Sequence, residues 1–347
     1  MTHTVTYARA INEALHQEMA RDERVFVFGL DVADHEGING TTLGLAERFG
    51  SERCFSTPVS EDAMTGVALG AALNGLRPVH VHVRVDFLLL AMNQIANMIT
   101  TTRYMTGGEA GVPLVIRALV GRGGGQSAQH SKALHSVFAH LPGLKVVMPT
   151  SPNDAKGLLV SAIRDNDPVL FLEHRWLNDV SGEADVESAG IPLGSARIMR
   201  EGSDATVVAT SWMAVEALRA AEILHERGVE LEVIDPRTIV PLDVDSITAS
   251  VQRTQRCVVA DNDWTFCGFS AEVAATVSER CFGALLRPVA RVGWPSVPCP
   301  TARSLEELFY PSAREIVRAV ETQLDLEPMN LRDIAFYSDE NRFLGPC

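Results

Sequence analysis

The chain has 347 residues, and 30 basic against 44 acidic side chains give it a formal net charge of −14 at pH 7. Hydrophobic residues make up 46% of the chain and charged residues 21%, a balance typical of packed globular proteins and not of disordered ones. The acidic charge comes without a cluster of Lys and Arg, which argues against binding to nucleic acid or to an anionic membrane surface. The length favours two domains over one.

No segment has the pattern of a targeting signal or a membrane span. Residues 1–24 mix acids, bases and apolar residues and lack the apolar core of a signal peptide. The longest uncharged run, residues 87–102, is shorter than the roughly 20 apolar residues that cross a bilayer. The six cysteines show no CxxC pair or zinc spacing and are interpreted as reduced thiols. We therefore expect a cytoplasmic protein without membrane or nucleic-acid partners.

Helical and strand-like patterns alternate along the first half of the chain. Apolar residues at helical spacing predict a first helix over residues 6–21, and a β-rich run ending in glycine predicts a strand over residues 25–29. The further helices predicted for this half are residues 61–73, 88–105 and 152–165, and its further strands are residues 78–85, 112–118, 145–148 and 169–173.

The same alternation continues in the second half. Its predicted strands are residues 205–210, 231–235, 256–261 and 288–293, and its predicted helices are residues 213–226, 244–252, 270–282 and 312–322. Strands that alternate with helices indicate parallel, doubly wound sheets, so the predicted fold class is α/β with two doubly wound domains. Residues 177–188 have several acids and no apolar period, which favours a linker. We expect domains over residues 1–185 and 186–325, followed by a C-terminal tail over residues 326–347.

A carboxylate stands at the start of the helix predicted over residues 61–73. Ser60, Glu61 and Asp62 precede a run of small and apolar residues. One interpretation is a capped helix, with Ser60 as the cap and the two acids favoured by the positive end of the helix dipole. The other is a carboxyl group at Glu61 that hydrogen-bonds a nitrogen of a bound heterocycle.

A glycine-rich loop over residues 121–126 leads to His130. Glycines let a backbone approach a ligand closely, and a histidine after a β-strand of an α/β sheet lies where ligands usually bind. An incidental histidine in a plain loop is the alternative. The loop lacks the spacing of a P-loop or of a dinucleotide fingerprint. His80 and His82 share one face of a predicted strand, but the sequence indicates no third ligand for a metal.

Three segments together resemble one protein family. They are residues 57–79 (TPVSEDAMTGVALGAALNGLRPV), residues 127–175 (beginning SAQHSKALHSVFAHLPGLKVV) and residues 295–300 (PSVPCP). They resemble the β subunits of thiamine-diphosphate-dependent 2-oxo acid dehydrogenases, the E1 β chains of pyruvate, branched-chain and acetoin dehydrogenases. The resemblance implies a transketolase-like pyrimidine-binding domain followed by a transketolase C-terminal domain.

The resemblance also implies roles for single residues. Glu61 matches the family's glutamate, whose carboxyl group hydrogen-bonds the aminopyrimidine of thiamine diphosphate and promotes the tautomer that activates the cofactor. His130 matches the histidine of the family's QHS motif, which helps to protonate or orient the reacting groups. Asp31, Arg84 and Phe87 match positions near the cofactor.

Two kinds of metal ion are implied as well. A loop that holds a structural K⁺ in some family members is matched by Leu114, Ala162, Ile163, Asp165 and Asp167. Carbonyl and carboxylate oxygens suit a hard cation, although a plain helix-to-strand turn is the alternative. Mg²⁺ and the diphosphate are bound in this family mainly by an α subunit with a GDG…N motif. No GDG occurs here, so we expect such an α partner in an α2β2 heterotetramer, with a lipoyl acyltransferase as a further partner.

The chain departs from the family at several of these positions. Leu30 stands where many members have Glu, and Val81 and Arg84 stand where an acid and an aromatic residue are usual. Lys132 replaces the usual Gln after the QHS motif. Arg84 brings a cation to the expected mouth of the site, where it either binds an anionic substrate or pairs with Asp86.

We interpret the chain as the β subunit of an enzyme that decarboxylates a 2-oxo acid, such as pyruvate, and transfers the acyl group. Two alternatives stay open on sequence alone. One is a two-chain thiamine-diphosphate carboligase, an acyloin synthase or transketolase-like enzyme of a biosynthetic pathway. The other is a non-catalytic stabilising subunit, against which the presence of both Glu61 and His130 argues.

Overall fold

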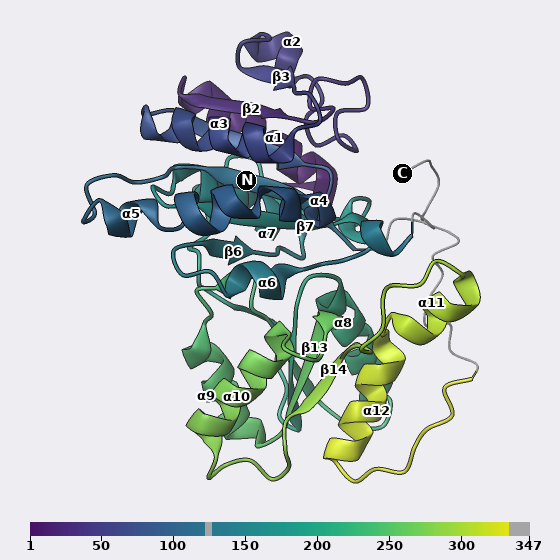
Figure 1. Cartoon of the computed structure of the whole chain (residues 1–347). Helices are drawn as coiled ribbons and strands as arrows, with labels where there is room; N and C mark the ends of the chain where they lie inside the picture. The colour runs from purple at the N-terminus through teal and green to yellow at the C-terminus, as the bar shows by residue number, and fades with distance from the viewer. Residues whose placement is uncertain (122–126, 333–347) are drawn as a thin grey trace. The chain divides into compact units, whose positions relative to one another are not determined.

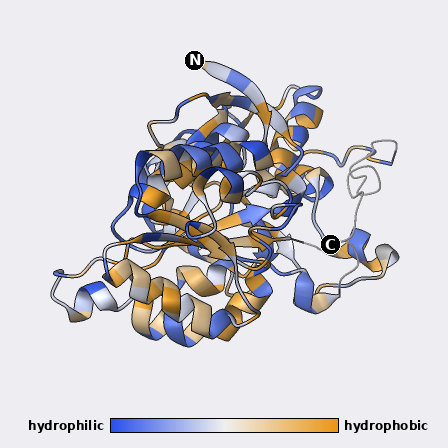
Figure 2. Cartoon of the chain, turned by 90° about the horizontal axis from the view of Figure 1, so that it is seen from above, coloured by the Kyte–Doolittle hydropathy of each residue, from blue (hydrophilic) through white to orange (hydrophobic). Residues whose placement is uncertain are grey.

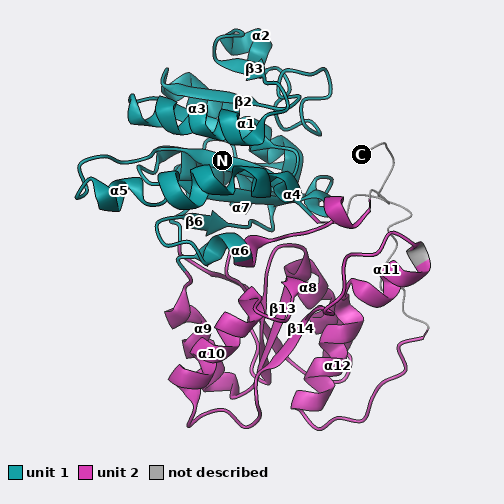
Figure 3. Cartoon of the chain, in the orientation of Figure 1, with its two compact units in different colours: residues 1–120, 137–193, 238–241 teal, residues 121–136, 194–237, 242–347 magenta. Residues whose placement is uncertain are grey.

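A computed structural model describes residues 1–121 and 127–332 of the chain (Figure 1). The chain divides into two compact units (Figure 3). Unit 1 comprises residues 1–120, 137–193 and 238–241, and unit 2 comprises residues 121–136, 194–237 and 242–347. Strands are mostly orange in Figure 2 and the helices mix orange with blue, as expected for buried strands covered by amphipathic helices. No helix in the described part of the chain is long and apolar enough to cross a bilayer.

Unit 1 is built on a seven-stranded sheet with the order β12-β6-β7-β5-β4-β2-β3. All neighbours pair in parallel except β12, which is antiparallel to β6. The strands are β2 (Val25–Gly29), β3 (Cys54–Ser56), β4 (Arg77–His82), β5 (Val115–Val120), β6 (Lys145–Val147), β7 (Val169–His174) and β12 (Thr238–Val240). This order confirms the doubly wound α/β sheet predicted for the first half.

The main helices of unit 1 begin at sequence signals for helix starts. Helix α1 (Tyr7–Arg21) follows Thr6, whose side chain accepts from the Arg9 amide, and helix α7 (Pro152–Arg164) follows Ser151, which caps the Asp154 amide. These two helices pack against each other. Unit 1 also contains the helices α2 (Leu45–Phe49) and α3 (Glu61–Leu73), and helix α6 (His135–Ala139) begins with two residues of unit 2 and ends in unit 1.

Two of the segments predicted for unit 1 have a different structure. The expected linker contains strand β8 (Ser181–Asp185), which pairs antiparallel with β1 (Thr2–Thr6). The acids of this two-stranded sheet interrupt the apolar alternation by which a strand is recognised in a sequence. The helix expected over residues 88–105 is a series of short pieces: α4 (Val85–Leu88), the 3₁₀ turn η1 (Leu89–Ala91), the π-helix η2 (Asn93–Ile99) and α5 (Thr102–Met105).

Unit 2 has a five-stranded sheet with the order β14-β13-β10-β11-β9, parallel except for β9 at its edge. The strands are β9 (Arg197–Arg200), β10 (Ala205–Ala209), β11 (Leu231–Asp235), β13 (Cys257–Trp264) and β14 (Ala290–Trp294). The helices are α8 (Trp212–His225), α9 (Val244–Thr254), α10 (Phe269–Cys281), α11 (Arg303–Phe309) and α12 (Ala313–Gln323). A second doubly wound domain is thereby confirmed. Residues 333–347 of the expected tail lie outside the described residues.

An ion pair is buried within the sheet of unit 1. Arg117 on β5 donates from Nε and Nη2 to the two carboxylate oxygens of Glu173 on β7, at 2.6 and 2.8 Å. The Arg117 side chain is 0% exposed and that of Glu173 is 1% exposed. Each charge is out of water, so each depends on the other for its solvation.

We predict that Arg117→Met destabilises the fold by about 3–5 kcal/mol, because it leaves a buried carboxylate without its cation. The double variant Arg117→Met/Glu173→Leu is expected to recover most of that loss, since it removes both charges. Urea unfolding of the wild type, both single variants and the double variant measures the coupling. Equal stability of Arg117→Met and the wild type would contradict the prediction.

Candidate active site

The carboxyl edge of the unit 1 sheet gathers most of the residues singled out from the sequence. Strands β4, β2 and β3 are neighbours and run in parallel, so their carboxyl ends meet at one edge. Asp31 follows β2, Glu61 follows β3, and Arg84 and Phe87 follow β4. Ligands of open α/β sheets bind outside the carboxyl ends of the strands. The fold therefore brings four sequence-predicted residues to the edge where a ligand is expected.

Glu61 is the first residue of helix α3. Its side chain is half-buried and makes no hydrogen bond or ion pair with any residue that the structure describes. The expected side-chain cap at Ser60 does not form, whereas the neighbouring carboxylate of Asp62 accepts from Gln94 at 3.4 Å. The helix dipole favours an anion at Glu61, and its oxygens are available to a ligand.

Arg84 is buried, and its Nε lies 3.2 Å from Oδ2 of Asp86. Of the two interpretations of this cation, pairing with Asp86 is thus the one that the structure shows. Burial and the Arg84 charge together lower the pKa of His174 to about 3. Phe87 is half-buried in α4, and Asp31 is exposed with a backbone φ of 55° in the turn after β2.

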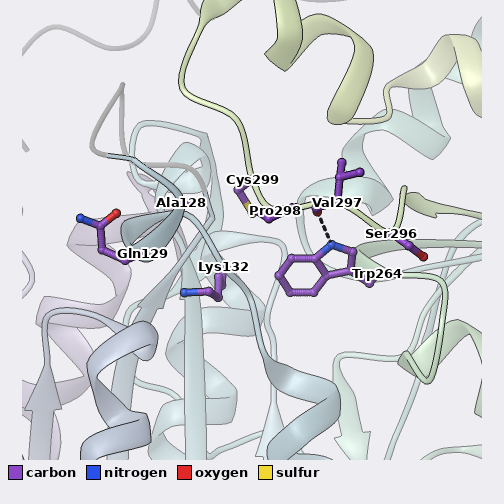
Figure 4. A pocket seen from close by; sticks show the side chains of 8 residues that line it. All are labelled: Ala128, Gln129, Lys132, Trp264, Ser296, Val297, Pro298 and Cys299. Carbon is purple, nitrogen blue, oxygen red and sulfur yellow. Dashed lines mark hydrogen bonds between the residues drawn. The ribbon is translucent and has the colours of Figure 1, made fainter.

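His130 belongs to unit 2 and ends the 3₁₀ turn η3 (Ala128–His130). Residues 122–126 of the preceding glycine-rich loop lie outside the described residues. A pocket of about 510 Å³ lies beside η3, lined by Ala128, Gln129, Lys132, Trp264, Ser296, Val297, Pro298 and Cys299 (Figure 4). The Trp264 indole donates to the Val297 carbonyl at 2.8 Å, and the Lys132 ammonium extends away from the ring. Residues 296–299, part of the PSVPCP motif, line this pocket, and the sequence alone does not predict that placement.

A buried charged cluster lies a few residues further on and was missed by sequence reasoning. His135 is 0% exposed, and its Nε2 lies 3.0 Å from Asp261 Oδ1 while its Nδ1 lies 3.9 Å from Asp263 Oδ2. Burial opposes protonation, but the two carboxylates outweigh it and raise the pKa of His135 to about 9. The partners are more than 120 positions away in the sequence, so no local pattern indicates them.

His80 and His82 on β4 point to one face, as their spacing predicts. The His80 ring stacks on Phe28 with centroids 4.4 Å apart, its Nδ1 donates to the Phe28 carbonyl, and His82 Nε2 lies 3.3 Å from the Thr65 hydroxyl. Burial lowers the pKa of His80 to about 4 and also lowers that of His82. Within the described residues no group of three or more His, Cys, Asp or Glu side chains is arranged to hold a metal ion.

The turn matched to a K⁺ site already contains protein cations. Lys145 lies 2.6 Å from the Asp165 carboxylate, and Arg103 lies 2.9 Å from that of Asp167. Arg77 Nη1 donates to the carbonyls of Ile163 and Asp165, both at 2.9 Å. The carbonyls of Leu114 and Ala162 accept from the amides of Val169 and Asp165. The oxygens expected to bind the metal thus have other partners, and these contacts do not fit a bound K⁺ ion.

Comparison with known proteins first gives the class of the two domains. The family model for the pyrimidine-binding domain of transketolase matches residues 3–179, and that for the transketolase C-terminal domain matches residues 194–316. A solved structure described as a split-gene transketolase, an inactive β4 tetramer, has the same fold with a TM-score of 0.73 and 24% identity. It covers 93% of this chain and 99% of its own.

Curated relatives give the family itself. The β subunit of acetoin:2,6-dichlorophenolindophenol oxidoreductase from Cupriavidus necator is 43% identical over 92% of this chain and 97% of its own length. The pyruvate dehydrogenase E1 β subunit from Rickettsia felis is 41% identical over 91% of this chain and 97% of its own. The chain belongs to the family of E1 β subunits of 2-oxo acid dehydrogenases. Membership of this family implies the use of thiamine diphosphate.

We predict that the chain has no requirement for K⁺. Its unfolding temperature is expected to be the same in potassium chloride as in choline chloride at equal ionic strength, because Arg77, Lys145 and Arg103 supply the positive charge of the turn. Arg77→Ala is expected to lower stability by about 1–3 kcal/mol, the usual cost of lost charged hydrogen bonds. Stabilisation of the wild type by K⁺ but not by choline would contradict the prediction.

The buried neutral histidines predict a loss of stability in mild acid. Because the pKa of His80 falls from 6.5 to about 4 on folding, the unfolded chain binds more protons between those values, and stability falls as pH falls through that window. The loss from His80 is on the order of 3 kcal/mol. Urea unfolding between pH 7 and pH 4 is expected to show a flatter dependence for His80→Phe than for the wild type. Parallel curves would show that His80 is not buried in its neutral form.

Proposed function

We propose that the chain is the β subunit of an enzyme that uses thiamine diphosphate to decarboxylate a 2-oxo acid and pass the acyl group to an acceptor, acting with an α subunit. The observation that carries the proposal is the carboxylate of Glu61. It stands at the start of α3, on the carboxyl edge of the sheet, with no partner among the described residues. A polar group of this kind, at the position where ligands bind, is suited to a heterocycle nitrogen.

The surroundings of Glu61 fit the aminopyrimidine of thiamine diphosphate. When bound, this cofactor supplies a carbon nucleophile that also accepts the electrons released with CO₂. Glu61 would hold a proton between its carboxyl group and a ring nitrogen, while the N-terminus of α3 stabilises the carboxylate form. Phe87, half-buried after β4, and Asp31, after β2, would border the ring, and Arg84 would act through its pair with Asp86.

His130 is proposed to handle protons on the substrate side. An imidazole is suited to donate a proton to a carbonyl oxygen or to accept one from an acyl acceptor near neutral pH. The Ala128–His130 turn adjoins a pocket of about 510 Å³ that is lined by Trp264, Val297 and Pro298 among others. Ala128, Gln129 and Lys132, which flank His130 in the chain, line this pocket. This setting supports the assignment, because a reacting 2-oxo acid and its acceptor need a partly apolar space near the segment that carries the histidine.

An α subunit is proposed to complete the site. The sequence has no GDG motif, so Mg²⁺ and the diphosphate would be held mainly by that partner. Two neighbouring elements of unit 1 expose apolar side chains that suit burial in an interface: α3 with Val67 and Leu73, and the η1–η2 segment with Leu90 and Met98. We propose an α2β2 heterotetramer in the cytoplasm. In the β subunit, we propose a pyrimidine-binding domain over residues 1–185 and a C-terminal domain over residues 186–325. Of the expected tail, Leu326, Met329 and Leu331 pack on the hydrophobic core of unit 2.

The proposed substrate class is supported by the name of one relative, a pyruvate dehydrogenase E1 β subunit; the name of another cites acetoin, which is a hydroxy ketone and not a 2-oxo acid. A lipoyl acyltransferase is the acceptor proposed for a member of this family. The carboligase and the non-catalytic subunit are not favoured, since nothing in the described part of the chain supports either of them. The residues of the candidate site are present, and the chain covers nearly the whole length of the relatives.

We predict that Glu61→Gln lowers 2-oxo-acid-dependent dye reduction by about 10²–10⁴-fold, the range for a lost acid–base group. Asp62→Asn is the matched control, because Asp62 is exposed in the same helical turn and its carboxylate faces Gln94. Both variants are to be assayed as the complex purified with its own α partner, together with CO₂ release and thiamine diphosphate binding. Full activity of Glu61→Gln would instead support a non-catalytic subunit.

A further inference from the structure

The segment that carries His130, residues 127–136, belongs by its contacts to unit 2, although the residues on both sides of it in the sequence belong largely to unit 1. We call it the His130 segment. Its last two residues, His135 and Ser136, both reach β13 of unit 2, and the second also reaches α10. These contacts fix the end of the segment to the C-terminal domain.

His135 makes the first of these attachments. Its ring is fully buried between Asp261 and Asp263 on β13, with Phe269 of α10 packed edge-on at a centroid distance of 6.3 Å. Asp261 is held in turn by the Thr210 hydroxyl at 2.7 Å and by the Asn262 amide. The carboxylate of Asp261 is therefore oriented by groups outside the segment, and it fixes the orientation of the imidazole.

Ser136 makes the second attachment. Its hydroxyl donates to Asp263 Oδ2 at 2.9 Å and accepts from the Phe269 amide at 2.8 Å. That amide lies at the start of α10, where Gly268 passes so close to the Trp264 carbonyl that a Cβ would lie 2.0 Å from its oxygen. One carboxylate, Asp263, thus serves both His135 and Ser136, and the two attachments form one network.

The other end of the segment is organised locally. The His130 amide donates to the Ser127 carbonyl at 3.1 Å, and the Ser131 hydroxyl donates to the same carbonyl at 2.9 Å. Cys299 Sγ lies 3.6 Å from the Ser131 carbonyl, which ties the middle of the segment to the wall of the pocket. Because His130 is only five residues from His135, its position depends on where the buried cluster holds the segment.

We propose that His135 is a positioning residue: its buried pairing with Asp261 and Asp263 holds the His130 segment on the C-terminal domain so that His130 stays beside the pocket. This proposal rests on the proposed function, in which His130 acts on the reacting groups. It assigns a role to a charged cluster that the chemistry described above does not use. A plain core contact would stabilise unit 2 without affecting the geometry of His130.

Among the described residues, the charges that face His135 are Asp261 and Asp263 on β13. Phe269, which packs on His135 from α10, is uncharged, as is Thr210, which binds Asp261 from the turn after β10. With its pKa at about 9, His135 is a cation at neutral pH and loses its proton in mild alkali. Because folding raises the pKa of His135, the contribution of this residue to stability is complete below pH 6.5 and is lost as pH rises through about 9. In the wild type, the His130 segment is therefore expected to loosen over that range.

The test compares His135→Gln and Ser136→Ala with His225→Gln, all in the complex purified with the α partner. His225 of α8 also pairs with a carboxylate, that of Glu230, but it is 60% exposed, so it controls for loss of a His–carboxylate pair in the same unit. Amide hydrogen exchange over residues 127–136 reports the segment directly. Steady-state kinetics with the 2-oxo acid separates kcat from KM, and thiamine diphosphate binding is measured in parallel.

We expect His135→Gln to raise exchange across residues 127–136 and to lower kcat about 10-fold to 100-fold, with cofactor binding unchanged, because ångström-scale misplacement of a reacting group costs rates of this order. Ser136→Ala is expected to have a smaller effect of the same kind, and His225→Gln none. The alkaline fall in kcat near pH 9 should disappear in His135→Gln. If His135→Gln unfolds, the proposal is tested by Ser136→Ala and by amide exchange of the wild type between pH 7 and pH 10.

Unchanged exchange over residues 127–136 in both variants, or loosening without any fall in kcat, would overturn the proposal. The exchange measurement does not depend on turnover. A wild-type complex that shows the expected protection but no 2-oxo acid activity would therefore reject the proposed function and leave the attachment of the segment established.

Discussion

The candidate site depends on the parallel order of β4, β2 and β3. Because these strands are adjacent and point the same way, the residues that follow them emerge at one edge of the sheet, and α3 begins there. The carboxylate of Glu61 thereby lies at the positive end of a helix and at the edge where α/β proteins bind ligands. A reversed strand in this group would carry its residues to the opposite edge.

Several charged groups of the two units have protein partners, and Glu61 differs from them in this respect. Arg117–Glu173 and His135 with its aspartates are buried charges with named partners. In the turn after α7, half-buried Lys145 pairs with Asp165 and exposed Arg103 pairs with Asp167. Glu61, by contrast, has no partner among the described residues. This arrangement supports the proposal that a ligand provides the hydrogen-bond partner of Glu61.

Most of the fold followed from the sequence because its signals are local. The starts of α1 and α7 are marked by Thr6, Ser151 and Pro152, and the strands are short apolar runs that end at glycines or turns. Strand β8 was not predicted from the sequence, because an acid-rich strand in a two-stranded sheet has no continuous apolar face. The π-helical η2 was read as part of one long α-helix, since its apolar residues continue the pattern of that helix.

Glu61 could be singled out locally, because it stands at the start of a predicted helix, whereas Asp31 and Arg84 were implied only by the family resemblance. The cluster of His135 was not predicted, because Asp261 and Asp263 come from a strand that folding alone brings to it. The pairing of Arg84 with Asp86, two residues apart, was one of two readings open on sequence and needed the structure to decide.

Native mass spectrometry of the chain purified from its own host would establish whether it is the β subunit of a two-chain enzyme. We expect a complex with a second chain of similar size that carries a GDG motif, with thiamine diphosphate bound in numbers equal to the β subunits. The mass of the intact complex gives its stoichiometry. A homo-oligomer of this chain alone, without bound cofactor even after thiamine diphosphate and Mg²⁺ are added, would contradict its assignment as a catalytic β subunit.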